Sequence, residues 1–254
     1  MPDQPLGLWR RLRAAWRIAR LTLHMLWGLC QVQLLFPRLD AERRQQRIQL
    51  WSRGVFRVLG IGWELQGHLH VRGQLLVANH VSWLDIMAVH AACPQARFVS
   101  KADIRSWPLI GRLVDAAGTI YIVREQRRDA MRVAHEMAHA LQAGDTVAFF
   151  PEGTTGPGDT LLPFHANLLQ PVIATGCPVL PLVLRYSEAA QPGPSVAAQY
   201  IGETTLLQSI VRMALADDLV VRLVALPPLA TQHADRRSLA AHLQAVMAEQ
   251  LTLI

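Results

Sequence analysis

A histidine and an aspartate stand five positions apart in a segment that reads Ala-Asn-His-Val-Ser-Trp-Leu-Asp, residues 78–85, after an apolar run. Five residues turn an ideal helix by about 500°, so His80 and Asp85 do not share a helical face. They meet if His80 lies in a strand-to-helix turn and the helix begins at Ser82, with Asp85 reaching back to one ring nitrogen. The other nitrogen is then left to accept a proton. The pair predicts a general base for a substrate that brings its own hydroxyl; the alternative is a capping aspartate beside a loop histidine.

Two further segments end an apolar run on residues that suit anions. Residues 147–156 read Val-Ala-Phe-Phe-Pro-Glu-Gly-Thr-Thr-Gly, a strand running into a glycine-rich turn whose amides suit a phosphate or an oxyanion. Glu152 in that turn is placed to orient a polar substrate group. Residues 118–124 put Arg124 after a buried strand, where a guanidinium clamps anions. Taken singly, each segment is equally an ordinary turn or a surface arginine paired with an acid.

The elements that must position these residues alternate between short apolar runs and helical patterns. Strands are predicted at 75–78, 98–100, 119–123, 147–150, 179–184 and 220–226, and helices at about 83–92, 108–116, 128–143, 168–175 and 238–251. This order is typical of an α/β fold with a largely parallel sheet flanked by helices, in which chemistry gathers at the strand ends. We predict two units, N-terminal helices over 1–60 and an α/β domain over 61–254.

The first sixty residues differ from the rest in charge. Residues 1–57 hold eleven arginines and three acidic residues, a net charge of +8, whereas the remainder carries −2 of the chain's total of +6. Apolar spacing predicts a helix from Leu8 to about Phe36 beside a stripe of arginines, then a second helix over 41–59. We predict that this amphipathic, Trp-rich hairpin attaches to the surface of an anionic membrane. A single span and packing on the protein's own domain are the alternatives.

Several other classes of protein are disfavoured. The chain beyond residue 57 is slightly acidic and shows no basic and aromatic module, so no nucleic-acid partner is expected. A Gly-x-Ser-x-Gly elbow does not occur, which disfavours a thioesterase or other serine esterase. The three cysteines stand far apart and no HExxH motif occurs, so neither a metal site nor a cofactor is expected.

Together and in this order, these segments resemble the lysophospholipid acyltransferase family, typified by 1-acylglycerol-3-phosphate acyltransferase. Its blocks are matched as N-H-x4-D at 79–85, G-x-[IV]-[FY]-[IV]-x-R at 118–124, F-P-E-G-[TS] at 150–154 and an apolar strand with a proline at 179–182. Residues 98–101 also look like the family's lysine-bearing strand. The resemblance covers residues 62 to about 186, and the last 60 or so residues match only in general character.

The resemblance implies a reaction and a role for each matched residue. His80 would be the general base on the free hydroxyl of a lysophospholipid, with Asp85 as its orienting partner. That hydroxyl would attack the thioester of acyl-carrier protein or acyl-CoA, with no acyl-enzyme intermediate. The implied substrate-binding residues are Lys101, Arg124, Glu152, Gly153 and Thr154. The expected product is phosphatidic acid, made for membrane phospholipid biosynthesis at the cytoplasmic face of the inner membrane.

One segment departs from the family's pattern. Many glycerophosphate-specific members have a lysine or arginine beside a phenylalanine after the F-P-E-G block, but here His165 follows Phe164. A histidine is a weaker and pH-dependent partner for phosphate. This leaves room for another lyso-lipid acceptor, such as lyso-ornithine lipid, which carries a carboxylate and no phosphate. The alternative is that His165 caps the helix that follows it.

Overall fold

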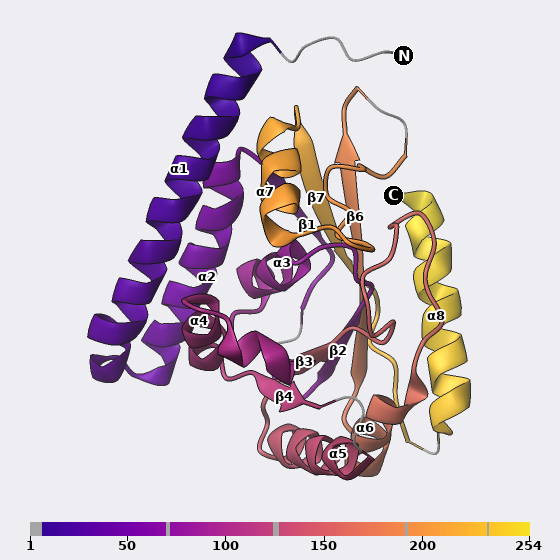
Figure 1. Ribbon diagram of the computed structural model, residues 1–254. Coiled ribbons are helices and arrows are strands. Elements are labelled where there is room, and N and C mark those ends of the chain that lie inside the picture. Colours follow the sequence, from indigo (N-terminus) through magenta and orange to yellow (C-terminus); the bar gives the residue numbers. More distant parts are fainter. Residues whose placement is uncertain (1–6, 70–71, 124–126, 191–192, 233) are drawn as a thin grey trace.

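The computed structural model describes residues 7–69, 72–123, 127–190, 193–232 and 234–254. Within them, a sheet of seven strands lies between two groups of helices (Figure 1). The strands are β1 Gly62–Gln66, β2 Leu75–Ala78, β3 Arg97–Lys101, β4 Ile120–Ile122, β5 Val147–Phe149, β6 Val179–Glu188 and β7 Leu219–Ala225. The helices are α1 Leu8–Cys30, α2 Ala41–Leu59, α3 Leu84–Ala92, α4 Ile110–Ala116, α5 Arg127–Gln142, α6 Gln170–Thr175, α7 Leu206–Leu215 and α8 Arg236–Leu253.

The strand order is β1-β7-β6-β2-β5-β3-β4, and every neighbouring pair is parallel except β6 with β7. This confirms the predicted α/β fold with a largely parallel sheet. In the middle of the sheet, Val77 of β2 stands opposite both Phe149 of β5 and Pro181 of β6. Parallel strands end at the same edge of a sheet, where binding sites form. The turn after β2, with His80, therefore lies beside the turn after β5, with Glu152.

Each face of the sheet has its own apolar core, and β2 contributes to both. Leu76 and Ala78 belong to the core beneath α2, α3 and α7, whereas Leu75 and Val77 belong to the core beneath α5, α6 and α8. All four side chains are at most 3% exposed. Alternation between two buried faces is what a strand covered on both sides requires. The strand that carries the histidine is thus held from both sides.

Two elements of the sheet domain, β1 and α7, were not predicted from the sequence. The edge strand β1 pairs along β7, and its residues Gly-Trp-Glu-Leu-Gln form no apolar run because the strand is partly exposed. The helix α7 begins at a capping box in which Thr205 accepts from the Gln208 amide and the Gln208 side chain accepts from the Thr205 amide. A Thr-x-x-Gln spacing before an apolar run was the signal for that helix.

The predicted N-terminal helical hairpin is confirmed, with a change at its tip. After Cys30 the α-helix continues as a π-helical turn over Gln31–Leu35 and a 3-10 turn over Phe36–Arg38. The two helices are joined by a reciprocal contact: His24 Nε2 donates to the Trp51 carbonyl at 2.9 Å, and Trp51 Nε1 donates to the His24 carbonyl at 3.1 Å. Their rings stack with centroids 5.4 Å apart. A Cβ at Gly28 would lie 2.4 Å from Trp51 Nε1, so only glycine fits there.

The second helix of the hairpin is part of the core of the molecule. Val55, Phe56 and Leu59 on α2 are at most 2% exposed and pack with residues of α3 and the sheet. The boundary between residues 1–60 and 61–254 stays a prediction, but the side chains on its two sides share one apolar core.

The arginine stripe of α1 is in part directed at the protein itself, which differs from the expectation that it faces a membrane. Arg13 pairs with Asp217, and Arg17 donates to the Ala216 carbonyl at 2.8 Å. Arg10 also pairs with Asp217 at 2.7 Å. The cause is that the C-terminal end of α7 and the following aspartate offer negative partners to these guanidinium groups.

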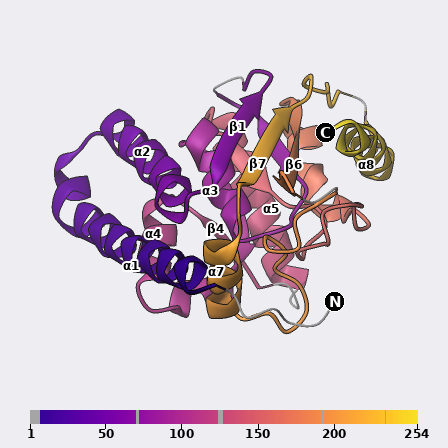
Figure 2. The same ribbon diagram turned by 90° about the horizontal axis from the view of Figure 1, so that it is seen from above.

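The outward side of α1 is apolar. Its exposed large side chains are Leu8, Trp9, Leu12, Trp16, Leu23, Leu26 and Trp27, each at least 46% exposed. Figure 2 shows the hairpin on one side of the sheet, with α1 running beside α4 and α7. Among the described residues, no helix is both long and apolar enough to cross a bilayer.

Candidate active site

The predicted histidine and aspartate meet at the start of α3. His80 Nδ1 donates to Oδ2 of Asp85 at 2.7 Å, and the Asp85 side chain is fully buried while that of His80 is 19% exposed. The helix begins at Leu84, shortly after the expected start at Ser82 or Trp83, so Asp85 lies in its first turn. A carboxylate only accepts, so Nδ1 carries a proton, and in the neutral ring Nε2 keeps its lone pair.

Four donors converge on the Asp85 carboxylate. Besides His80, Oδ2 accepts from the backbone amides of Val81 at 2.6 Å and Ser82 at 2.9 Å, and Oδ1 accepts from the Tyr186 hydroxyl at 2.7 Å. Burial and the charge of Asp85 raise the pKa of the Tyr186 phenol, so it remains a donor. Tyr186 was missed by the sequence reading, because a tyrosine near the end of an apolar strand signals only packing.

Two side chains fix the backbone around His80. Asn79 bridges to β6, accepting from the Leu184 amide at 2.7 Å and donating to its carbonyl at 2.9 Å. Glu152 accepts from the His80 amide at 2.7 Å and from the Leu162 amide at 2.8 Å, one with each carboxylate oxygen. Burial raises the pKa of Glu152, opposed by these two hydrogen bonds. Glu152 therefore ties the two active-site turns together.

The imidazole of His80 is also held from the side. It stacks on the Phe150 ring with centroids 3.9 Å apart and planes 5° from parallel, and the Gly156 amide donates to the His80 carbonyl at 2.7 Å. Nδ1 is hydrogen-bonded to Asp85, one face of the ring stacks on Phe150, and both the N–H and the C=O of His80 are hydrogen-bonded. The ring is therefore held in a single orientation. Such preorganisation is what proton transfer at Nε2 requires.

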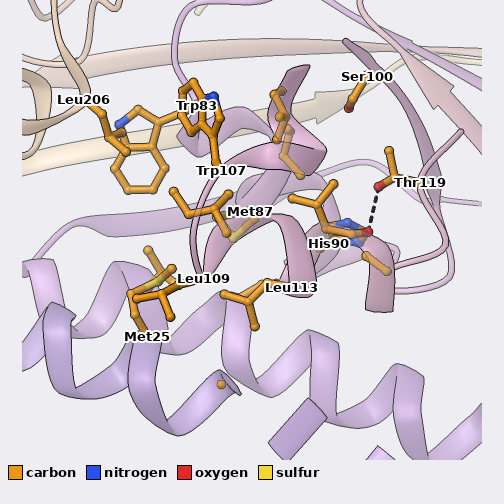
Figure 3. A pocket seen from close by; sticks show the side chains of 18 of the residues that line it. Met25, Trp83, Met87, His90, Ser100, Trp107, Leu109, Leu113, Thr119 and Leu206 are labelled. Atoms are coloured by element: carbon orange, nitrogen blue, oxygen red, sulfur yellow. Dashed lines mark hydrogen bonds between the residues drawn. The ribbon is translucent and has the colours of Figure 1, made fainter. Parts of the chain in front are cut away.

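An apolar cavity of about 650 Å³ begins at His80 and lies between the hairpin, α3 and α4. Along α3 it is lined by Trp83, Ile86, Met87 and His90, which recur at helical spacing. Figure 3 labels further residues of its wall: Met25 of α1, Trp107 and Leu109 before α4, Leu113 of α4 and Leu206 of α7. The cavity suits a long hydrocarbon chain, because most of the side chains in its wall are apolar.

Of the predicted substrate-binding residues, Gly153 and Thr154 line this cavity together with His80. Gly153 has φ of +70°, which favours glycine, and a Cβ there would also lie 3.1 Å from the His165 ring. Its amide donates to the Phe150 carbonyl at 3.1 Å, so it closes the turn.

Of the two predicted cationic residues, the structure describes only Lys101, which is not among the residues that line the cavity. Lys101 ends β3 with its side chain 54% exposed and pairs with Asp103 at 2.5 Å. Arg124 lies outside the described residues. His165 occupies the N-cap position of the turn Ala166–Leu169, but its side chain makes no cap hydrogen bond, so the proposed capping role is wrong.

The fold and the site define a class of protein. An imidazole held in one tautomer by a buried carboxylate, at the mouth of an apolar cavity, is a base positioned for a substrate with a hydroxyl and a hydrocarbon chain. A family model described as "Acyltransferase" matches residues 64–185. The chain is 40% identical to a 1-acyl-sn-glycerol-3-phosphate acyltransferase of Neisseria meningitidis over 175 residues, 68% of each chain. The chain belongs to the lysophospholipid acyltransferase family.

Two other proteins extend the comparison. A lyso-ornithine lipid O-acyltransferase of Pseudomonas aeruginosa is 33% identical over 240 residues, 92% of each chain. The crystal structure of the 1-acyl-sn-glycerophosphate acyltransferase of Thermotoga maritima superposes with a TM-score of 0.70 at 20% identity and covers 96% of this chain and 95% of that one. At 20% identity this match shows a shared fold alone. Because it covers 96% of this chain, the matched region includes the N-terminal helices. The protein is an acyltransferase of lipid synthesis.

Proposed function

We propose that this enzyme transfers a fatty acyl group from an acyl thioester to the free hydroxyl of 1-acylglycerol-3-phosphate, forming phosphatidic acid. The observation that carries the proposal is the hydrogen bond of 2.7 Å between His80 Nδ1 and Asp85 Oδ2 at the end of an apolar cavity. The 40% identity to a protein named for that acceptor supports the choice of substrate.

The chemistry follows from the free nitrogen of His80. Nε2 removes the proton of the acceptor hydroxyl as its oxygen bonds to the thioester carbonyl carbon. The carbon–sulfur bond then breaks, and the departing thiolate takes the proton from the imidazolium. Asp85 stabilises that imidazolium, and no group of the protein becomes acylated. The donor is the thioester of acyl-carrier protein or of CoA, and the cavity holds an acyl chain of the donor or of the acceptor.

Lyso-ornithine lipid is the second candidate acceptor. It is favoured by the similarity to the Pseudomonas aeruginosa acyltransferase of that name, which extends over 92% of both chains. The histidine at position 165, beside Gly153, is consistent with a headgroup that lacks phosphate. The two acceptors share the hydroxyl that His80 deprotonates, so the mechanism is the same for both.

The apolar row on α1 supports attachment to the surface of the membrane in which the acceptor resides. Trp9, Trp16 and Trp27 are 78%, 63% and 53% exposed, and tryptophan favours the interface between water and hydrocarbon. The cavity wall includes α1 and α2, so the same hairpin that meets the lipid also borders the substrate. We place the enzyme on the cytoplasmic side of the inner membrane, where acyl thioesters are available.

An acceptor panel tests the proposal. Purified full-length enzyme is given one labelled acyl thioester and 1-acylglycerol-3-phosphate, lyso-ornithine lipid or other lysophospholipids in vesicles. We expect transfer to 1-acylglycerol-3-phosphate that is lost in His80→Ala and kept in His242→Ala, an exposed histidine of α8 on the other face of the sheet. Transfer to lyso-ornithine lipid alone would establish the second candidate, and full activity of His80→Ala would refute the mechanism.

A further inference from the structure

The cavity beside His80 is apolar along most of its wall but polar at the end marked by His90. From Trp83 to His90 the helix α3 rises about 10 Å, which matches an extended chain of about eight carbon atoms. His90 is 3% exposed, and its Nδ1 has no hydrogen-bond partner among the described residues. Buried polar atoms in folded proteins are nearly always paired, so an unpaired one on a residue that lines a cavity points to a missing partner.

A second unpaired polar atom lines the same cavity. Ser52 of α2 is fully buried, and within the described part of the chain its Oγ has no hydrogen-bond partner. Its helix neighbours Gln49 and Arg53 donate to the Ala91 carbonyl at 3.2 and 3.1 Å. Since Ala91 follows His90, these contacts bring Ser52 to the His90 end of the cavity.

The surroundings of His90 keep it neutral. Burial lowers the pKa of His90 to about 4 against the opposing effect of the nearby Pro94 and Cys93 backbone, so near neutral pH one ring nitrogen donates and the other accepts. The ring packs edge-on against Phe98 at 5.2 Å, which limits its movement. Ser100 and Thr119 also line the cavity near His90 (Figure 3), but the Thr119 hydroxyl already donates to the Val114 carbonyl at 2.9 Å.

We propose that His90 and Ser52 select an acyl chain that carries a hydroxyl group at this end of the cavity. A hydroxyl both donates and accepts, so it pairs with a neutral imidazole and with a serine. A plain methylene chain that reaches this place leaves both polar atoms unpaired. The inference rests on the proposed function, because an acyl chain must enter the cavity from His80. The hydroxyl belongs either to the thioester's chain or to the chain already on the acceptor.

The test compares octadecanoyl thioesters that carry one hydroxyl at successive carbons with the plain octadecanoyl thioester. A second arm places the hydroxyl on the acyl chain of the acceptor and keeps a plain donor. We expect kcat/KM to favour the hydroxylated chain about tenfold at one position in one arm, the size of one net hydrogen bond. The ratio of kcat/KM for the hydroxylated chain to kcat/KM for the plain chain should fall to about one in His90→Phe. It should persist in His90→Asn and in Met87→Leu, which changes the wall one turn away.

Each outcome separates this inference from the proposed function. Ratios near one at every position in both arms of the wild-type enzyme overturn the inference, while His80-dependent transfer of the plain chain leaves the proposed function standing. A preference that persists in folded His90→Phe also overturns it. Loss of transfer with every plain substrate contradicts the proposed function itself. The wild-type ratios decide the question even if His90→Phe does not fold.

Discussion

The Tyr186 hydroxyl donates to Oδ1 of Asp85 at 2.7 Å, while the opposite oxygen of the same carboxylate holds His80 at 2.7 Å. The phenol comes from β6, 101 positions after the aspartate. Asp85 is therefore fixed from the core of the sheet as well as from its own turn. A base that depends on the orientation of a carboxylate depends on whatever fixes that carboxylate.

We expect Tyr186→Phe to lower kcat about tenfold with little change in KM. The phenol makes no contact that the substrate needs, but its loss removes one of the four hydrogen bonds that orient Asp85. Steady-state kinetics in vesicles measure the effect, with unfolding curves as the control for stability. An equal rise in KM would contradict a role through Asp85.

Asp85→Asn should lower kcat on the order of a thousandfold. An amide carries no charge to stabilise the imidazolium, and its NH2 group must face either the Tyr186 hydroxyl or the three donors that now bond to Oδ2. The fully buried position should also make the variant less stable by about 2–3 kcal/mol. Single-turnover acyl transfer and urea unfolding measure the two effects, and near-wild-type turnover in a folded variant would exclude the His80–Asp85 mechanism.

The stability of the protein should fall on acidification through His90. The pKa of His90 is lowered to about 4 by burial, below the ordinary 6.5, so the unfolded chain binds a proton that the folded state resists. The contribution of neutral His90 to the free energy of unfolding is fully present above pH 6.5. It is lost as the pH falls from 6.5 toward 4, by about 3 kcal/mol at most. Urea unfolding of wild type and His90→Phe over this range checks it. Parallel pH curves for the two proteins would show that His90 titrates normally.

Replacing Trp9 and Trp16 together by serine should release the enzyme from vesicles. Both rings are exposed on α1, 78% and 63%, and neither is in the core. Met131→Ser on α5, 75% exposed, is the matched control and should leave vesicle binding unchanged. Point changes are needed because deletion of the hairpin would remove Phe56 from the core. Vesicle flotation measures binding, and a double variant that floats like wild type would rule out this face.

The arginines of the N-terminal segment should contribute less to membrane binding than their number suggests. Arg10 and Arg13 pair with Asp217, and Arg17 donates hydrogen bonds to carbonyl groups at the end of α7. We therefore expect flotation to survive raised salt, because apolar contact is not screened. Complete release by salt alone, with both tryptophans intact, would show that charge carries the attachment.

Local spacing was enough to predict part of this protein. The motif Asn-His-x4-Asp, the glycine-rich turn after β5 and the alternation of strands and helices are short-range patterns, and they predicted the fold, the His80–Asp85 pair and the family. The order of parallel strands then places two such turns at one edge. Elements without a continuous apolar run, such as β1, were not predicted from pattern.

The tertiary structure decided what depends on residues distant in sequence. Tyr186 meets Asp85 only because β6 lies beside β2, and the two-oxygen tie of Glu152 exists only because β5 lies beside β2 as well. The cavity forms between helices that lie far apart in the sequence. Part of the arginine stripe on α1 contacts the protein because Asp217 lies next to it. Spacing along the chain fixes which side chains share a turn or a face, whereas partners and cavities arise from packing between elements.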